Sequence, residues 1–598
     1  MVKQSNGKVN KGVHSDVPNV ISGVHQIYER IDKGFKRWLV YFRRSFVIRL
    51  PHIRSVRRNV IVWLVIMLCL IVGAAAQLSL YYASVSAVKN VAGGSYTEGT
   101  LDKLTTINPL TVSTDTERAM SLLVYPSLLR YDETGHLMGY LAESWRVSAD
   151  AKTWTINLKD SPIWSDGKKI TARDVVFTTE LMSQTSGTNS LAGVKVTSKG
   201  DQTVIFELPT ASASFVSGLT FGVLPEHIFR GKSRADISSA ISGASNLVSG
   251  GPYKLAQTNS ANNSWHLTRN DNYWGGVPNL NEITFREYDS AADMASALKS
   301  GAIMSASGLT MNQVGSIRDN GEVIESQASD GTYAIFNTDS EIFADARVRR
   351  AVRLMIDRNK LRDKLAKRNK VSKIAPLETP IGKGIYKNVD DIKQPNLSVA
   401  EAARLLEAAG YTKTDGTWHS GSQANLSRPI KVVAASGSDN ADVAKIIVDD
   451  LNDGGFKAKL ELVDSETLRQ SYIQARNYDI IVYSYHLGAD PDVSTYWSSS
   501  QAKTGLNLAN YTNRRADIAL TAGRVNTDET VRAARYAAFV NDWINDCPAI
   551  ALYQGKSYRV THDGAKTVGS DDVIVDASSN IAHIMDWSAR RGVVMQTP

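Results

Sequence analysis

The sequence predicts an α/β protein with two large lobes, preceded by a single transmembrane helix. Three observations support this fold class: an uncharged apolar run near the amino terminus, a strand–helix pattern at residues 430–486, and about 500 further residues free of repeats, enough for two lobes with cores of their own. Hydrophobic residues make up 43% of the 598 residues and charged residues 21%, which excludes collagen-like and wholly disordered proteins.

The formal charge of +8 is concentrated at the amino terminus. Residues 1–58 contain 13 Lys and Arg against 3 Asp and Glu, a net +10, so the rest of the chain carries a net −2. The basic character therefore belongs to the terminal segment, and we expect no nucleic-acid partner for the body. The two cysteines, Cys69 and Cys547, are too few for a disulfide scaffold or a thiolate-ligated zinc cluster.

The uncharged run covers residues 59–88, and its apolar centre is Val60–Ala76. About 20 apolar residues cross a ~30 Å hydrocarbon layer as a helix, so residues 59–83 are predicted to span the membrane. Three arginines within residues 54–58 flank one end, whereas Lys89 is the first charge beyond the other. The positive-inside rule then places the basic terminal segment in the cytoplasm and the main body outside the cell, as a single-pass protein of the cell membrane.

Two alternatives stay open for this region. Ala74-Ala75-Ala76 resembles the cleavage site of a signal peptide, and Arg43-Arg44 resembles a twin-arginine signal.

Within residues 1–58, apolar residues recur at three- and four-residue steps from Val24 to Phe42 with basic residues between them, which predicts a basic amphipathic helix on the inner leaflet. Residues 84–94 are small and polar and are predicted to be a short linker.

The clearest pattern in the body lies at residues 430–486. It reads as three short strands separated by two helices, in the order Ile430–Ser436, Ala441–Asp453, Phe456–Leu462, Asp464–Arg476 and Tyr478–Tyr485. Such a βαβαβ unit implies parallel strand pairing with helices packed on the sheet.

Ligands of open parallel sheets bind beyond the carboxyl ends of the strands, and two loops fall there. One is Ser436–Asp439. The other is Tyr485–Asp492, which combines aromatic surface, a flexible glycine and two carboxylates and is our first choice. A carboxylate in a partly dry cleft suits a cationic group. An equally weighted alternative is that Asp490 has no role in binding and only caps a turn before Pro491.

Several short motifs resemble those of family-5 extracellular solute-binding proteins, which include the oligopeptide- and dipeptide-binding components of ABC importers. The matching segments, in chain order, are Thr105–Leu110 (TTINPL), Leu141–Trp145 (LAESW), Trp154–Phe177 (WTINLKDSPIWSDGKKITARDVVF), Gly250–Leu255 (GGPYKL), Phe343–Leu361 (FADARVRRAVRLMIDRNKL), Leu405–Tyr411 (LLEAAGY) and Gly505–Asp517 (GLNLANYTNRRAD). The sequence departs from the family pattern at Tyr485, where many members carry Trp, and in the shortened stretch Ala489–Asp492.

The resemblance implies a two-lobed periplasmic-binding-protein-like fold (type II, cluster C-like) with an extra subdomain in the amino-terminal lobe. The expected boundaries are 95–340 for that lobe with the subdomain at about 131–245, 341–560 for the carboxy-terminal lobe, and 561–598 for a return to the first lobe. In peptide-binding relatives an aspartate holds the α-ammonium, which points to Asp490 or Asp492 here. The complete set of candidate ligand-binding residues is Asp490, Asp492, Tyr485, His486, Tyr483, Asn108, Tyr125 and Asn337.

Most motif residues also have structural explanations. Ser165-Asp166-Gly167 is predicted to be a tight turn, and Thr171 is predicted to cap a helix starting near Ala172. Within Phe343–Leu361, apolar residues at 348, 351, 352 and 355 form one helical stripe, so we expect a core helix whose arginines are solvated.

Three short motifs match those of a class of serine enzymes. Ser165–Lys168, Ser438–Asn440 and Lys503–Gly505 match the S-x-x-K, S-D-N and K-T-G motifs of serine β-lactamases and penicillin-binding proteins. That mechanism requires the serine at the start of a helix, whereas Gly167 and the flanking alternation predict a hairpin turn. We therefore expect no enzyme activity, cofactor or metal.

The sequence as a whole favours an extracellular solute-binding protein that captures short peptides and delivers them to an ABC permease and its ATPase. Two alternatives remain: the same fold with another ligand, such as a nickel complex, an oligosaccharide or haem, and a membrane-anchored sensory subunit.

Overall fold

The structure is a computed structural model that describes Val40 and residues 53–90, 93–184, 191–242, 247–259, 263–420, 428–562, 565–589 and 591–595. The predicted amphipathic helix lies outside the described residues apart from Val40. The described chain divides into a unit that contains helix α2 and a large body, Lys89–Gly592.

Helix α2 extends over Ile53–Val85 and is 33 residues long. Its section Val60–Leu78 is long and apolar enough to cross a membrane, and none of that section is buried against other parts of the protein. After the helix, β1 (Ser86–Asn90) pairs with β21 (Arg591–Met595) in a two-stranded sheet.

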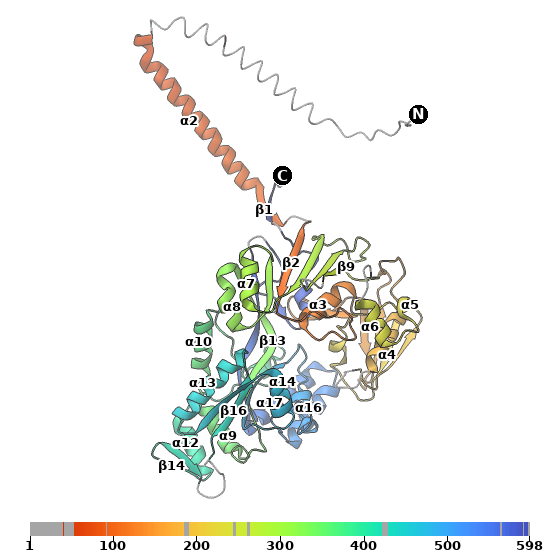
Figure 1. Ribbon diagram of the computed structural model, residues 1–598, viewed down its shortest axis with the longest axis vertical. Coiled ribbons are helices and arrows are strands. Elements are labelled where there is room, and N and C mark those ends of the chain that lie inside the picture. Colours follow the sequence, from red (N-terminus) through yellow and green to blue (C-terminus); the bar gives the residue numbers. More distant parts are fainter. Residues whose placement is uncertain are drawn as a thin grey trace, which may run out of the picture. The chain divides into compact units, whose positions relative to one another are not determined.

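The body is organised around one 11-stranded sheet (Figure 1). In pairing order its strands are β17 (Ala458–Val463), β16 (Ile430–Ala435), β18 (Ile480–His486), β13 (Glu322–Phe336), β19 (Ala549–Thr561), β12 (Ser305–Leu309), β2 (Ser95–Thr100), β11 (Glu282–Glu287), β10 (Ser264–Arg269) and β9 (Tyr253–Asn259), with β20 (Val573–Ile574) beside β13. We call the half with β2 and β9–β12 the N-lobe and the half with β16–β18 the C-lobe.

Two long antiparallel strands, β13 and β19, connect the lobes. The amino-terminal half of β13 pairs with β19 within the N-lobe, and Asp330–Phe336 of the same strand pair with β18 of the C-lobe. The β13–β19 register shifts between Gln327 and Gly331, where the strands pass from one lobe to the other. This irregularity makes the crossing point the natural place for bending.

Three smaller sheets complete the strands. A four-stranded sheet contains β5 (Ala142–Val147), β6 (Thr153–Leu158), β8 (Thr203–Glu207) and β7 (Lys195–Lys199); the two hairpins are β3 (Leu129–Tyr131) with β4 (Leu137–Gly139), and β14 (Tyr411–Thr414) with β15 (Thr417–Ser420). The four-stranded sheet lies within residues 142–207, inside the region where an extra subdomain is expected.

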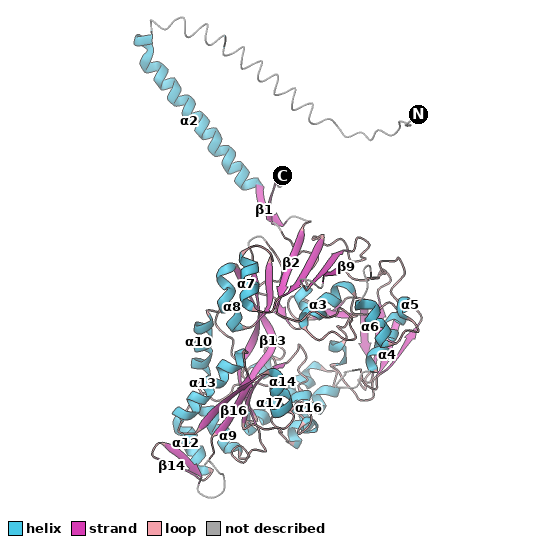
Figure 2. Ribbon diagram, viewed as in Figure 1, coloured by secondary structure: helices cyan, strands magenta, loops and turns pink. Residues whose placement is uncertain are grey.

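Helices cover the faces of the sheets (Figure 2). The α-helices of the body are α3 (Asp115–Val124), α4 (Ala172–Ser183), α5 (Glu226–Phe229), α6 (Arg234–Ser242), α7 (Ala291–Lys299), α8 (Met311–Ile317), α9 (Ala346–Met355), α10 (Arg358–Asn369), α11 (Lys387–Asp390), α12 (Val399–Ala408), α13 (Asp439–Asp453), α14 (Ser465–Thr467), α15 (Ser494–Trp497), α16 (Arg514–Val525) and α17 (Glu529–Asp546).

The predicted βαβαβ unit is present as β16, α13, β17, α14 and β18, with a π-helix at Leu468–Ile473 continuing α14. Strand β16 pairs in parallel with both β17 and β18, as the pattern predicted. The unit forms because each strand is short and apolar and α13 buries one stripe, Val443, Ala444, Ile447 and Leu451, on the sheet.

The buried apolar side chains form three large clusters. One cluster belongs to the N-lobe and includes Tyr125 and Trp164, and another belongs to the C-lobe and includes Trp497 and Trp543. The third is shared by both lobes, because Leu298 and Val314 of the N-lobe belong to the same cluster as Val352 of the C-lobe. The lobes are therefore joined by packed side chains as well as by strands.

The expectation that the arginines of α9 are solvated is wrong for two of them. Arg349 and Arg353 are buried, only 6% and 4% exposed. Arg349 donates through Nη2 to the carbonyl oxygen of Asp546 (2.6 Å), and Arg353 donates through Nη1 to that of Ile544 (2.7 Å). These carbonyls lie at the carboxyl end of α17, where they have no partner within the helix and attract positive charge.

Candidate functional site

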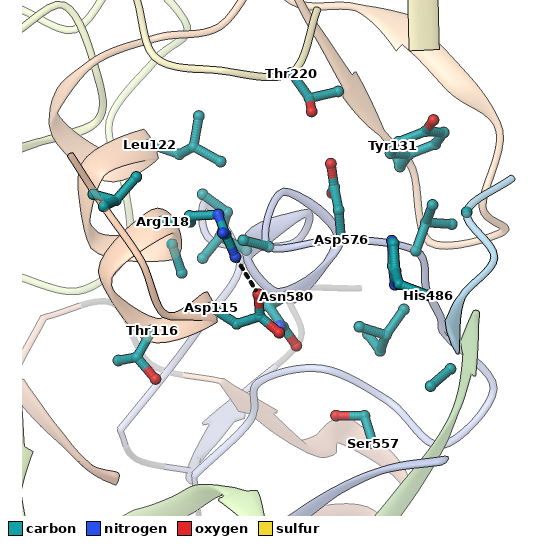
Figure 3. A pocket seen from close by; sticks show the side chains of 18 of the residues that line it. Asp115, Thr116, Arg118, Leu122, Tyr131, Thr220, His486, Ser557, Asp576 and Asn580 are labelled. Atoms are coloured by element: carbon teal, nitrogen blue, oxygen red, sulfur yellow. Dashed lines mark hydrogen bonds and ion pairs between the residues drawn. The ribbon is translucent and has the colours of Figure 1, made fainter. Parts of the chain in front are cut away.

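A cleft with a cavity of about 1230 Å³ lies between the lobes. Its wall is contributed by α3, by residues 214–222 of the N-lobe, by β12, by the crossing strands β13 and β19, by residues 486–492 after β18, and by residues 574–581 after β20. Figure 3 shows side chains from several of these segments converging on the cavity, among them Tyr131, His486, Ser557 and Asp576.

Three of the eight predicted ligand-binding residues line this cleft: His486, Asp490 and Asp492. All three come from the stretch Tyr485–Asp492 that was our first choice: His486 is the last residue of β18, and the two aspartates follow in the loop. In the other loop, Ser436–Asp439, the Asp439 carboxylate instead accepts the backbone N–H groups of Met311 (2.9 Å) and Asn312 (3.2 Å) at the start of α8.

Two of the three predicted tyrosines, Tyr483 and Tyr485, lie behind the cleft wall and do not line the cavity. Tyr485 is 3% exposed, donates its hydroxyl to the Leu506 carbonyl oxygen (2.9 Å) and stacks on Tyr496 with 4.2 Å between ring centroids. Tyr483 is partly buried and packs edge-on against Tyr485. Both support the binding loop from the C-lobe core.

The three predicted residues at positions 108, 125 and 337 have contacts within the protein. Asn108 donates to Ser238 Oγ (2.9 Å), and its side-chain oxygen accepts the Leu110 N–H (3.1 Å). Tyr125 is fully buried in the N-lobe core. Asn337 is 6% exposed and donates to the backbone oxygens of Arg476 and Tyr478, each at 3.1 Å.

Asp490 forms a two-pronged ion pair with Arg532 of α17. Arg532 Nη2 lies 3.0 Å from Oδ1 and 2.8 Å from Oδ2 of Asp490, and the arginine side chain is only 4% exposed. Burial alone would lower the pKa of Arg532, but the Asp490 carboxylate raises it overall, so the guanidinium stays charged. The Asp490 charge is thus already balanced within the protein.

Asp492 takes part in contacts that join the lobes. Its Oδ2 accepts from Ser214 Oγ of the N-lobe (3.3 Å) and lies 3.2 Å from Nε of Arg524 in the C-lobe. Next to this contact, the Ala213 N–H donates to the Arg524 carbonyl oxygen (2.8 Å). The lobes therefore touch directly at the cleft, as in a closed arrangement.

A buried charged group forms part of the N-lobe wall. Arg559 Nη1 lies 2.7 Å from Oε1 and 2.8 Å from Oε2 of Glu98, and Tyr96 donates its hydroxyl to the same carboxylate. The guanidinium also lies over the Trp587 ring, 5.4 Å from its centroid. Burial raises the pKa of Tyr96 well above its usual value, and the Glu98 charge raises it further. The hydroxyl therefore remains a hydrogen-bond donor.

His486 is surrounded by carboxylates from three other segments. Its Nδ1 lies 2.9 Å from Asp330 Oδ1 of the crossing strand, and this hydrogen bond raises the pKa of the imidazole. The negative charges of Asp115 and Asp576 in the N-lobe raise it further. Protonation of His486 is therefore favoured by both lobes together.

Several cleft residues escaped prediction from the sequence, namely Asp115, Arg118, Asp330, Asp576 and Asn580. They come from segments far apart in the chain, and no short motif links them. Asp115 and Arg118 form an exposed ion pair (2.8 Å) one helical turn apart in α3, as Figure 3 shows. Their i, i+3 spacing was the only local signal of a charged pair.

No group of three or more His, Cys, Asp or Glu side chains among the described residues is arranged to hold a metal ion. The three segments of the enzymatic alternative also have local explanations. Ser165 lies in a turn closed by the bridge between Ile163 and Lys169, as predicted. Ser438 precedes α13, and its hydroxyl donates to the Ala435 carbonyl oxygen (2.7 Å). Lys503 pairs with Asp339.

Residues 136–507 match the model of the middle region of the bacterial extracellular solute-binding proteins, family 5. The chain belongs to this family. It is 24% identical to the oligopeptide-binding protein AppA of Bacillus subtilis (strain 168) over 484 residues, which cover 79% of this chain and 88% of AppA. The predicted family resemblance is confirmed, and the protein is a substrate-binding protein of the ABC-importer type.

Solved structures of other family-5-like proteins share the fold. AppA of Bacillus subtilis in complex with a nonapeptide superposes with a TM-score of 0.66 at 22% identity, covering 84% of this chain and 99% of that chain. NikZ of Campylobacter jejuni in complex with Ni(L-His) gives a TM-score of 0.67 at 21% identity, covering 83% and 99%. The predicted two-lobed α/β fold is thereby confirmed.

Proposed function

We propose that this family-5 protein binds short peptides in the cleft between its lobes and delivers them to an ABC permease. The cavity carries the argument: about 1230 Å³ exceeds the range of about 300–1,000 Å³ that holds a drug-sized molecule. Its lining combines carboxylates, hydroxyls and apolar groups, which suits a ligand with a polar backbone and varied side chains. The oligopeptide-binding relatives support the same ligand class.

Peptides of a few residues should copurify with the protein from its native host and be detected by mass spectrometry after denaturation. Ser557→Trp should weaken this retention, because Ser557 faces the cavity from β19 and an indole there would obstruct part of the space that a peptide occupies (Figure 3). Ser300→Trp is the matched control, since Ser300 is exposed at the end of α7, outside the cleft.

The alternative ligands give different results in the same experiment. A nickel complex would appear as metal in elemental analysis without peptide, as expected if the likeness to NikZ extended to the ligand. Recovery of a nickel complex, a sugar or haem in place of peptide would reject the peptide proposal.

We also propose that α2 anchors the protein in the cell membrane with the body outside, as its length and apolar composition favour. The protein should stay with the membrane pellet after alkaline carbonate extraction. The double variant Leu64→Arg, Leu68→Arg should be released from the pellet, because each arginine at the centre of the span raises the free energy of membrane insertion by about 2.5–3.5 kcal/mol. Arg at Ser84, beyond the apolar centre, is the control. A mature protein that begins after Ala76 would contradict the anchor and support a cleaved signal.

A further inference from the structure

The charged side chains that line the cleft are unequal in number. Among the described residues, seven carboxylates line it, those of Glu98, Asp102, Asp115, Asp330, Asp490, Asp492 and Asp576, against three lysine and arginine side chains, those of Arg118, Lys556 and Arg559. Every one of these three cations already has a carboxylate partner: Asp115, Glu325 and Glu98, respectively. The part of the wall that the structure describes therefore offers no unengaged lysine or arginine to an anionic ligand.

Arginines behind the wall neutralise two more of the carboxylates, since Arg532 pairs with Asp490 and Arg524 with Asp492. Among the described residues, the three lining carboxylates with no lysine or arginine in ion-pair contact are Asp102, Asp330 and Asp576. Asp102 is occupied by the backbone N–H and hydroxyl of Thr116, and Asp330 by His486. Asp576 alone of the three has no cationic or hydroxyl partner from a neighbouring segment.

Asp576 is held in a fixed direction by its own segment. Its Oδ1 accepts the N–H (2.8 Å) and hydroxyl (2.6 Å) of Ser578 and the N–H of Ser579 (3.4 Å). Those contacts occupy only one oxygen. In Figure 3 the Asp576 side chain lies on the same side of the view as Tyr131 and His486, and its negative charge contributes to the raised pKa of both of these residues.

Two further groups of the lining are buried without a hydrogen-bond partner. The Ser121 hydroxyl, on the same helix as Asp115 and Arg118, belongs to a residue that is 2% exposed, and the indole N–H of Trp587 belongs to one that is 3% exposed. Buried polar groups are rarely left unpaired in a complete assembly. Both groups belong to residues of the cleft lining, where a ligand with hydrogen-bonding atoms would supply the missing partners.

We propose that the cleft selects peptides that carry a lysine or arginine side chain, and that the Asp576 carboxylate receives its cationic end. Tyr131 would lie beside the same group and add aromatic surface to the contact. The selection follows from the charge balance of the cleft lining. A lysine or arginine side chain of the ligand balances the unpaired carboxylate, whereas an acidic side chain adds to the excess of negative charge. This inference rests on the proposed peptide ligand.

Calorimetric titration of the full-length protein in detergent, with Ala-Lys-Ala and Ala-norleucine-Ala, tests it. The two peptides differ in the side-chain ammonium and have similar chain length. We expect the lysine peptide to bind at least tenfold more tightly to the unsubstituted protein, and Asp576→Asn to remove most of this preference. Asparagine preserves the contacts with Ser578 and Ser579 because its oxygen still accepts hydrogen bonds. Asp571→Asn, an exposed residue of the same segment outside the cleft, should leave the preference intact.

Equal affinities of the unsubstituted protein for the two peptides would overturn the proposal. So would an Asp576→Asn protein that loses affinity for both peptides to the same extent, since Asp576 would then be a structural residue. If neither peptide binds, titration with spermidine separates the two proposals: binding that Asp576→Asn weakens supports the cationic site and rejects the peptide, and absence of binding rejects both.

Discussion

Replacing Arg559 with methionine should lower the free energy of unfolding by about 3–5 kcal/mol, the cost of breaking a buried ion pair from one side. The pair joins β2 to β19, and its members are 9% and 2% exposed in their side chains. Without the guanidinium, the Glu98 carboxylate would stay in a nearly dry site with only the Tyr96 hydroxyl beside it. Urea denaturation of the protein in detergent, followed by tryptophan fluorescence, measures the loss.

Two control variants define this result. The double variant Glu98→Gln, Arg559→Met should recover much of the loss, since it removes both charges and leaves neither uncompensated. Arg118→Met breaks an ion pair whose side chains are 48% and 75% exposed, and it should cost less than about 1 kcal/mol. A single Arg559 variant as stable as the unsubstituted protein would show that the pair contributes nothing to the N-lobe.

Arg532→Met should be the second most destabilising change, at about 2–4 kcal/mol. It leaves Asp490 without its only cationic partner among the described residues. The expected cost is smaller than for Arg559 because the Asp490 side chain is 23% exposed and water can reach it. Arg524→Met is the matched control. Arg524 pairs with Asp492 but is 46% exposed, so its replacement should lower the free energy of unfolding less than that of Arg532.

The variant Asp490→Asn separates two roles of this aspartate. If Asp490 serves the fold through Arg532, Asp490→Asn lowers stability and changes the affinity for Ala-Lys-Ala by less than about fivefold, or roughly 1 kcal/mol. If Asp490 holds the ligand's terminal ammonium, as the resemblance implied, the affinity falls much further while unfolding changes little. Calorimetry and denaturation of one preparation distinguish these outcomes.

The parts of the fold that the sequence predicted are those set by local patterns. The strand and helix periods at residues 430–486 specify β16, α13, β17 and β18 without reference to distant residues, and the glycine at 167 marks its turn. The loop after β18 lies at the cleft, at the edge of the sheet where the parallel strands of the unit end.

The remaining features depend on partners far away in the chain. Whether Arg349 is solvated is decided by the carboxyl end of α17, about two hundred positions later, and whether Asp490 is available is decided by Arg532. The wall of the cleft gathers residues from positions 98 to 587. Sequence periodicity carries no information about contacts between residues so far apart. The loop that contributes to the candidate site could therefore be predicted, but the ion pairs that set the charge of the site could not.

The apolar cluster shared by the lobes has a consequence for how the body can be divided. If the chain were cut at the crossing strands, Leu298 and Val314 on one piece and Val352 on the other would lose their common packing and face water. Neither piece could then be produced as a stable fragment by truncation at that point. A chimaera that combines one lobe of this protein with the other lobe of a relative would need side chains on both lobes that pack together in this shared cluster.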